Sequence, residues 1–191
     1  MDLRECLLTR RSVRKYKSDP LSDELLMKIL EPALAAPSGA NRQHWHFVVI
    51  RSPESMKRLR EYMLQAVELT SQEMKERFAK NPEVVEQTRN FFVTLGGAPV
   101  CILAFQMEKA YSNPSSATQS VAAAIENLLL SAWAEGVGTC WISPPMTEEF
   151  KEEVRRAFAP EKGPFVAAVT MGYPDQTPEM PRRRDGRYVF I

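Results

Sequence analysis

An alanine-rich segment over residues 117–135 constrains the fold most, because its side chains are small on nearly every face of a helix. A helix that is apolar all round belongs in the interior of a domain rather than on its surface. Gly136 follows directly and predicts the helix end, since glycine adopts the left-handed backbone of a C-terminal cap without strain. We therefore expect a long central helix that packs tightly, either within one chain only or also against a symmetry-related copy.

Short apolar segments alternate with helical ones along the chain. The expected strands cover residues 47–50, 100–105, 139–143 and 165–172. The expected helices cover residues 2–9, a segment from Ser22 that Pro32 should kink, a segment from Pro53, the polar stretch 70–95, and residues 148–158. This alternation predicts a central sheet covered by helices. The 191 residues are enough for one domain, residues 1–191, with its own core.

The C-terminal segment combines prolines with an apolar end. Pro174, Pro178 and Pro181 disfavour regular structure there, yet the chain closes with four apolar residues, 188–191. A frayed terminus does not normally carry four consecutive apolar side chains. We therefore expect an extended arm that delivers a final strand to a distant sheet edge. In one alternative, that edge belongs to a second subunit.

The composition excludes several classes of function. Hydrophobic residues make up 44% of the chain and the net charge is +1, so no overall field attracts nucleic acid or an anionic membrane. The first apolar stretch is too short for a signal peptide and is interrupted by Glu5. The three scattered cysteines, Cys6, Cys101 and Cys140, argue against a disulfide framework. We expect a cytoplasmic protein whose cysteines are small buried hydrophobes rather than reactive thiols.

Three arginines, Arg10, Arg11 and Arg14, surround Ser12 just after the first expected helix. Guanidinium groups match phosphate oxygens with paired hydrogen bonds, and a serine hydroxyl adds another. Two interpretations stay open: an anion site, or a solvated basic helix end that complements the helix dipole. Residues 182–184 form a second basic group, which by itself indicates surface solubility or weak nucleic-acid contact.

The loop before the first expected strand is rich in turn-forming and neutral polar residues. Pro37 and Gly39 shape the turn, while Ser38, Asn41 and Gln43 supply hydrogen-bonding groups that suit a planar heterocycle. An ordinary capped loop is the alternative interpretation.

Two histidines, His44 and His46, lie two residues apart at the end of this loop. Metal ligands sometimes share this spacing, but no cluster of Cys, Asp or Glu completes a site, so we expect no bound metal. The chain also lacks a glycine-rich dinucleotide motif, a Walker loop and a nucleophile elbow.

Four segments occur in a characteristic order: RRSVR near residue 10, PSGANRQHWHFVVI near residue 40, AAAIENLLLSAWAEGVGTCWI near residue 130, and PRRR near the end. Together they resemble the nitroreductase family over nearly the whole chain, residues 65–95 excepted. The resemblance implies an α+β fold with a central mixed sheet flanked by helices. It also implies an intimate homodimer that holds FMN at its interface, with the C-terminal arm extended onto the partner subunit.

The resemblance implies a set of FMN-binding residues as well. Those expected at the phosphate, the ribityl chain and the pyrimidine edge are Arg10, Arg11, Ser12 and Arg14, with Arg182 and Arg184 on the same phosphate. Those expected to contact the flavin from the other subunit are Pro37, Ser38, Gly39, Asn41 and Gln43. Those expected to face the flavin ring and its N5 are Ser143 and Pro144.

Two positions depart from the family pattern. His44 stands where a proline usually precedes the tryptophan, which changes the group beside the flavin edge. Longer relatives place an asparagine and a lysine before the second strand and use both on FMN. Here Asn90 is the nearest candidate and no lysine matches. Residues 65–95 are expected to form a lid or to flank the dimer.

The expected chemistry is that of the flavin. NAD(P)H would transfer hydride and leave before a nitroaromatic, quinone or similar small oxidised substrate takes its place. Arg14 is expected to stabilise the reduced ring electrostatically, because a guanidinium does not release its proton. Two alternatives stay open. One is a reductive dehalogenase, for which Glu68, Glu73 and Lys75 occupy the lid region; the other is a non-catalytic module that binds nucleic acid or another anion.

Overall fold

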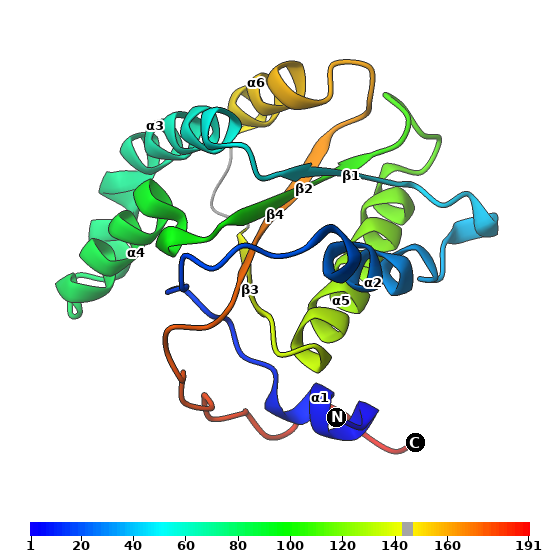
Figure 1. Ribbon diagram of the computed structural model, residues 1–191, viewed down its shortest axis with the longest axis horizontal. Helices are drawn as coiled ribbons and strands as arrows, with labels where there is room; N and C mark the ends of the chain where they lie inside the picture. The colour runs from blue at the N-terminus through cyan, green and yellow to red at the C-terminus, as the bar shows by residue number, and fades with distance from the viewer. Residues whose placement is uncertain (143–146) are drawn as a thin grey trace.

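The computed structural model describes residues 1–142 and 147–191 (Figure 1). Its helices are α1 (Leu3–Thr9), α2 (Asp23–Leu34), α3 (Pro53–Arg77), α4 (Pro82–Thr94), α5 (Pro114–Ala134) and α6 (Glu148–Phe158), with the short 3-10 turns η1 (Gly39–Asn41) and η2 (Leu95–Gly97). Its strands are β1 (Trp45–Ile50), β2 (Val100–Gln106), β3 (Gly138–Ile142) and β4 (Phe165–Gly172). The other helices and strands expected between residues 2 and 172 are found, and α6 and β4 have the expected bounds. The helical stretch expected over residues 70–95 is instead divided between the end of α3 at Arg77 and α4 from Pro82, and the last residue of the strand expected over 139–143 lies outside the described residues.

Capping side chains fix where several of these helices begin. Ser22, Ser52 and Thr147 each precede a helix, and each side-chain oxygen accepts a hydrogen bond from the backbone N–H three residues later. That contact satisfies one of the N–H groups that a helix start leaves without a partner. The signals for these starts are local, which is why the sequence locates them well.

The strands lie in the order β1-β2-β4-β3, and each neighbouring pair is antiparallel. The expectation of a mixed sheet is therefore wrong for the described strands. The chain passes from β2 through α5 to β3, which runs parallel to β2, but β4 then inserts between the two. Parallel strands are thus not neighbours. The one parallel pairing found in residues 1–142 and 147–191 is an isolated bridge between Ser12 and Thr139.

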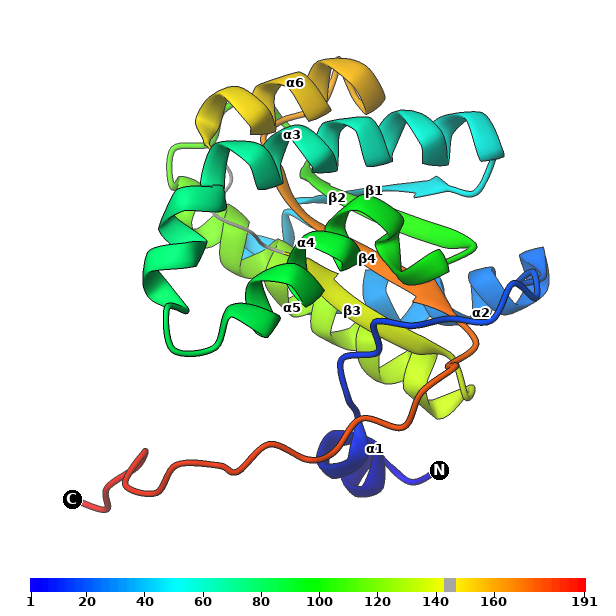
Figure 2. The ribbon, with the colours of Figure 1, turned by 90° about the vertical axis from the view of Figure 1, so that its left-hand side faces the viewer.

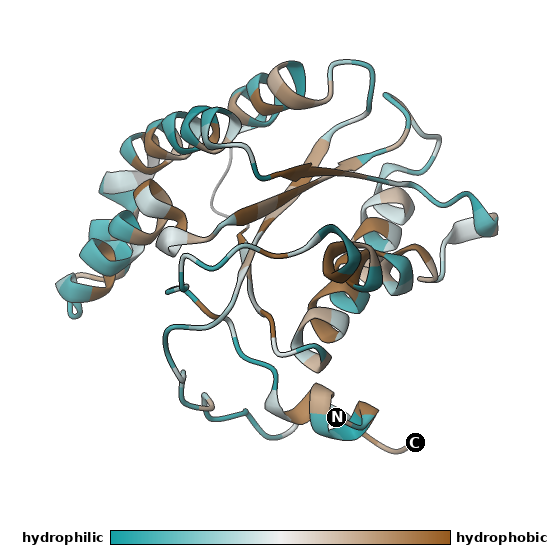
Figure 3. Cartoon of the chain, in the orientation of Figure 1, coloured by the Kyte–Doolittle hydropathy of each residue, from teal (hydrophilic) through white to brown (hydrophobic). Residues whose placement is uncertain are grey.

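Helices cover both faces of the sheet (Figures 1 and 2). α2 and α5 pack on one face, while α3, α4 and α6 pack on the other. Side chains of β2 alternate between the two layers, with Ile102 and Ala104 facing α2 and α5 and with Leu103 and Phe105 facing the opposite layer. Figure 3 shows the apolar strands enclosed by helices whose outer faces are more polar. Over the described ranges, no helix combines the length and apolarity that crossing a membrane requires.

The alanine-rich segment forms α5, as expected, and α5 is buried along most of its length. Ala117, Ala124 and Ala132 are fully buried, and their small side chains let α5 lie close to the sheet and to α2. Gly136 follows the helix with a φ of +74°, the left-handed conformation predicted for its end. Packing of α5 against a second copy stays a prediction.

α5 also compensates for the proline inside α2. Pro32 has no N–H, so the carbonyl of Lys28 lacks its helical donor. Ser131 Oγ on α5 donates to that carbonyl at 3.4 Å, and Asn127 Nδ2 donates to the carbonyl of Pro32 at 3.0 Å. These two bonds fix α2, and with it the start of the loop that follows.

After β4 the chain leaves the body as an extended arm (Figure 2). Its root is tied to the N-terminal segment: Lys17 N donates to the carbonyl of Tyr173 and Asp175 N to that of Lys15, both at 2.9 Å. Residues 188–191 are exposed and form no strand within this chain. The strand expected there does not form on the chain's own sheet, and its delivery to a partner stays a prediction.

We expect Ala124→Leu to destabilise the protein, because Ala124 is fully buried between α5, α2 and the sheet. Three added carbons in such packing cost about 1–3 kcal/mol. The matched control is Ala134→Leu, since Ala134 is exposed at the end of the same helix. Urea unfolding of both variants measures the difference. Equal midpoints for the two would contradict tight packing around α5.

Candidate functional site

The N-terminal basic segment lies along the outer edge of β3. Val13 N donates to the carbonyl of Thr139 at 2.8 Å, and Val13 itself is fully buried. This bond and the bridge at Ser12 hold the backbone in place. The side chains on either side of Val13 therefore start from fixed positions at the sheet edge, and those of Arg10, Arg11 and Ser12 are partly exposed.

The three arginines make different contacts. Arg10 Nε lies 3.7 Å from a carboxylate oxygen of Glu126, a solvent-accessible ion pair worth no more than about 1 kcal/mol. Arg11 turns back and donates to the carbonyls of Leu8 (3.1 Å) and Arg10 (2.6 Å), which caps α1. The Arg14 guanidinium is exposed and makes no hydrogen bond or ion pair with any described residue. Arg14 is thus the arginine of this group most available to a ligand.

Arg14 borders a hollow of about 470 Å³ between α4 and the edge of β3. That volume lies in the ordinary range for small-molecule sites, roughly 300–1,000 Å³. The lining residues are Arg14, Val84, Gln87, Thr88, Phe91, Phe92, Cys140, Trp141 and Ile142. Alternate residues of a strand direct their backbone groups to the same side. Since the carbonyl of Thr139 faces outward to Val13, the backbone N–H and C=O of Trp141 also face outward, on the side of the hollow.

The side chains behind this edge are buried and uncharged. Burial raises the pKa of the Cys140 thiol, against the opposing charges of Arg14 and Arg10. It also raises the pKa of Tyr16, whose hydroxyl contacts the Thr170 hydroxyl at 2.8 Å. Cys6, Cys101 and Cys140 are all buried free thiols, which confirms that they act as small hydrophobes. The β3 side of the hollow is therefore apolar, and Arg14 is the one cation among the described residues that line the hollow.

The loop that contains residues 37–43 has a preformed and strained backbone. Ala40, Asn41 and Gln43 have φ angles of 51°, 54° and 49°, in the left-handed region that side chains disfavour. Gln43 N donates to Ser38 Oγ at 3.0 Å. A Cβ on Gly39 would lie 2.7 Å from Ser116 Oγ, so a larger residue there would require the Ser116 hydroxyl to move. Strain of this kind persists only where the surroundings enforce it.

His44 closes this loop in an unusual setting. It is only 3% exposed, and its Nδ1 has no hydrogen-bond partner among the described residues. Its ring packs edge-on against Tyr111 at 4.6 Å, and the Arg42 guanidinium lies 5.1 Å from the centre of the Tyr111 ring. His44 therefore fixes the loop by packing. His46 lies in β1 instead, where burial lowers its pKa.

The two groups of candidate residues do not meet within the chain. Residues 37–43 precede β1 and residues 10–14 lie along β3, and these strands are the opposite edges of the sheet. The groups also contact different parts of α5: Gly39 lies at Ser116, whereas Arg10 pairs with Glu126. Ten helical residues separate these contacts, or about 15 Å along the axis. One chain thus presents two separate groups of candidate residues.

The remaining predicted residues belong to neither of these groups. Arg182 and Arg184 are exposed on the C-terminal arm and make no ion pair with the described part of the chain. Ser143 and Pro144 fall outside the described residues. Across the rest of the chain, no group of three or more His, Cys, Asp or Glu side chains is placed to hold a metal ion.

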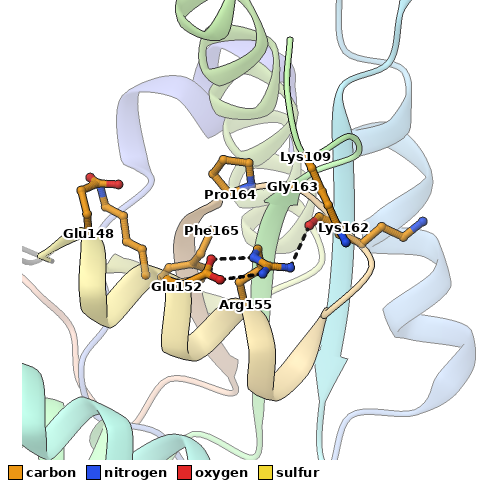
Figure 4. A pocket seen from close by; sticks show the side chains of 9 residues that line it. Lys109, Glu148, Glu152, Arg155, Lys162, Gly163, Pro164 and Phe165 are labelled. Atoms are coloured by element: carbon orange, nitrogen blue, oxygen red, sulfur yellow. Dashed lines mark hydrogen bonds and ion pairs between the residues drawn. The ribbon is translucent and has the colours of Figure 1, made fainter.

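A separate cavity of about 400 Å³ lies beside α6 (Figure 4). Arg155 at its centre donates to both carboxylate oxygens of Glu152 at 2.7 Å, and to the carbonyl of Pro160. The hydrogen bond from Arg155 is the main cause that lowers the pKa of Glu152 to about 2. Glu152 and Arg155 already satisfy one another, and the Lys162 ammonium, which also lines the cavity, contacts the Met107 sulfur at 3.6 Å.

Sequence reasoning missed the α4 wall of the hollow. Val84, Gln87, Thr88 and Phe91 line it with the spacing i, i+3, i+4 and i+7, which is one face of a helix. That spacing was visible in the sequence, but nothing in it showed that this face of α4 lies opposite Arg14.

Comparison with known proteins identifies relatives of the whole chain. The model of the nitroreductase family matches residues 7–173. YfhC of Bacillus subtilis (strain 168), provisionally named an NAD(P)H nitroreductase, is 30% identical over 98% of this chain and 92% of its own. The iodotyrosine deiodinase of Thermotoga neapolitana is 28% identical over 91% of this chain and 89% of its own.

A solved structure shows the same fold. A Desulfovibrio desulfuricans protein, provisionally assigned as a nitroreductase and solved in complex with FMN, superposes with a TM-score of 0.70 at 27% identity. The match covers 97% of this chain and 93% of that one. The family match extends from α1 to the end of β4, and it includes the basic segment beside β3 and the loop before β1. The chain therefore belongs to the nitroreductase family of oxidoreductases.

Proposed function

We propose that this chain is an FMN-dependent NAD(P)H oxidoreductase that reduces a nitroaromatic, a quinone or a similar small oxidised compound. The observation that carries the proposal is the free Arg14 guanidinium beside a hollow on the edge of β3, next to Arg10 and Ser12. The family and the FMN bound in the Desulfovibrio desulfuricans relative support it.

The residues at this edge fit FMN in their chemistry. Arg10, with Ser12 beside it and Arg182 and Arg184 from the arm, would hold the phosphate through charge-assisted hydrogen bonds. FMN would supply the redox chemistry, by accepting hydride from NAD(P)H and passing the electrons to the oxidised substrate. Arg14 would lie at the pyrimidine edge and stabilise negative charge there without giving up a proton. Ser143 and Pro144 are proposed to face the ring near N5.

A complete site on this scheme needs two chains. Loop 37–43 and the segment 10–14 lie at opposite sheet edges, so one flavin would contact both only if the loop came from a second subunit. The strained loop is already in a fixed shape for that contact. We therefore propose a homodimer in which Pro37, Ser38, Gly39, Asn41 and Gln43 of one protomer complete the site of the other.

The C-terminal arm has a matching place to dock. β1 is a sheet edge, and beside it lies a groove of about 580 Å³ with a largely apolar lining. The apolar side chains of the groove are Leu30, Leu34, Trp45, Phe47, Val49 and Met107. An open edge strand is a ready template for another strand. We propose that residues 188–191 of the partner subunit cover this edge.

Reductive dehalogenation is the second candidate, because the Thermotoga neapolitana deiodinase matches nearly the whole chain. Of the three residues expected in the lid, Glu68 alone lines the groove between α3 and α6. Glu68 lines this groove with Glu149 and Glu153, and neither Glu73 nor Lys75 lines it. Iodotyrosine is an amino acid that carries a carboxylate as well as an ammonium group, and the described lining of this groove has no cation for that carboxylate. We therefore propose reduction of a neutral oxidised compound first.

We expect the apoprotein to become yellow with FMN and to bleach when NADH or NADPH is added without oxygen. The measurement is stopped-flow absorbance, followed by reoxidation with a panel of nitroaromatics, quinones and halophenols. Fast reoxidation by a halophenol alone would favour dehalogenation. A protein that stays colourless with FMN and shifts RNA in a gel would instead support the non-catalytic module.

Arg182→Ala and Arg184→Ala should each weaken FMN binding by about ten- to a hundredfold, because each would remove a charge-assisted contact to the phosphate. Riboflavin, which has no phosphate, should bind equally to wild type and variants. Arg187→Ala is the matched control, since Arg187 is exposed on the same arm outside the proposed pair. Fluorescence titration of the apoproteins gives the affinities. Unchanged FMN affinity in both variants would contradict the phosphate assignment.

Deleting residues 186–191 should weaken both dimerisation and FMN retention, because β1 would lose its proposed cover. Replacing residues 188–191 with four serines should have the same effect, since it keeps the length of the arm and removes its apolar side chains. Sedimentation velocity with detection at the flavin wavelength measures both quantities. Wild-type protein that sediments as a monomer at micromolar concentration with flavin bound would refute the dimer proposal.

A further inference from the structure

One tyrosine ring contacts the residues on both sides of Gln43. Tyr111 lies in the segment that links β2 to α5 (Figure 1). Its ring lies edge-on to His44, with 4.6 Å between the ring centres, and the Arg42 guanidinium lies 5.1 Å from the centre of the Tyr111 ring. Between these two contacts, Gln43 has a φ of 49°, in the left-handed region that side chains disfavour. The ring is therefore placed to restrain the backbone at Gln43.

Both ends of loop 37–43 are held by the same stretch of chain. Met107 N donates to the carbonyl of His44 at 2.7 Å, and Gly39 N donates to Ser120 Oγ at 3.4 Å. Both anchors lie between the end of β2 and the first turns of α5. The loop therefore takes its position from this one stretch, which also carries the tyrosine.

Tyr111 acts on the loop through its ring rather than through a polar group. Its hydroxyl is buried and has no hydrogen-bond partner within the described ranges. Arg42 also forms an ion pair with Glu108 at 3.5 Å, but both side chains are about half exposed, so this pair contributes little. The ring contacts with Arg42 and with His44, which is 3% exposed, are thus the main side-chain restraints on this end of the loop.

We propose that Tyr111 is a positioning residue that keeps Gln43 in its left-handed conformation and so acts on the flavin bound by the partner subunit. This inference rests on the proposed function, in which loop 37–43 of one protomer completes the site of the other. A loop that spends only part of its time in the binding shape binds correspondingly more weakly. Arg14 and Tyr111 of one chain would therefore serve different flavins.

The first test compares single variants by fluorescence titration with FMN. Tyr111→Ala should bind FMN about tenfold more weakly if about one tenth of its loops keep the binding shape. Tyr111→Phe keeps the ring and should bind FMN as wild type does. The matched control is Tyr62→Ala, which removes a half-buried tyrosine on α3 that also packs edge-on, against Phe158 at 6.1 Å. This control should leave the FMN affinity unchanged.

Mixed dimers of Tyr111→Ala and Arg14→Ala chains, copurified through two different affinity tags, separate positioning from a general loss of structure. If Tyr111 acts on the partner's flavin, one site of the mixed dimer combines the intact Arg14 of one chain with the intact loop of the other. One site per dimer should then bind FMN with wild-type affinity, whereas neither homodimer has such a site. If Tyr111 acted within its own chain, every site of the mixed dimer would carry one defect.

A mixed dimer without a wild-type site would overturn the inference. Wild-type affinity in the Tyr111→Ala homodimer, no recovery in Tyr111→Phe, or an equal loss in Tyr62→Ala would overturn it as well. Should Tyr111→Ala fail to fold, Tyr111→Leu carries the same comparisons. These results leave the proposed function standing as long as the wild-type dimer binds FMN. Wild type that binds no FMN, or binds it as a monomer, would overturn the proposed function too.

Discussion

The burial of β2 and β4 on both faces is the constraint on which the rest of the molecule depends. Every residue of β2 and nearly every residue of β4 is buried between two layers of helices, so neither strand is suited to a sheet edge. β1 and β3 take the edges instead. The two edges then carry the two groups of candidate residues, loop 37–43 before β1 and residues 10–14 beside β3. The proposed need for a second subunit follows directly from this strand order.

Local signals in the sequence predicted the helices and strands well, but they did not predict which strands pair with one another. The helix starts at Ser22 and Pro53 were recognisable from their own neighbours, and the side chains of Ser22 and Ser52 cap these helices. The mixed sheet was wrong because strand direction depends on where β4 inserts, between two strands joined by α5. Nothing in the residues of β4 specifies that position. A run of apolar residues indicates that a strand is buried, but it does not specify which strands lie beside it in the sheet.

The residues of the candidate site also fall into two groups, those that local sequence signals predicted and those that they missed. The basic segment and loop 37–43 were predicted because their residue types are unusual over a few positions. Gln87 and Thr88 were missed, since a glutamine and a threonine on a polar helix have no distinctive pattern. These two side chains and Arg14 line the same hollow only because α4 packs opposite β3. Residues recruited from a distant helix become recognisable once the fold brings that helix to the site.

Unsatisfied polar atoms add an energetic argument about where function lies. Within the described ranges, the buried side-chain atoms without partners are His44 Nδ1, Tyr111 Oη and Thr139 Oγ1. Each such atom costs about 1–3 kcal/mol if nothing satisfies it. Two of them adjoin loop 37–43, and the third lies beside Ser12 at the edge of β3. These atoms lie beside both groups of candidate residues, and functional sites are where proteins most often depart from their own packing rules. Arg14 and Gln87 differ from these atoms because they remain hydrated. Both stay available to a ligand without an energetic cost to the free chain.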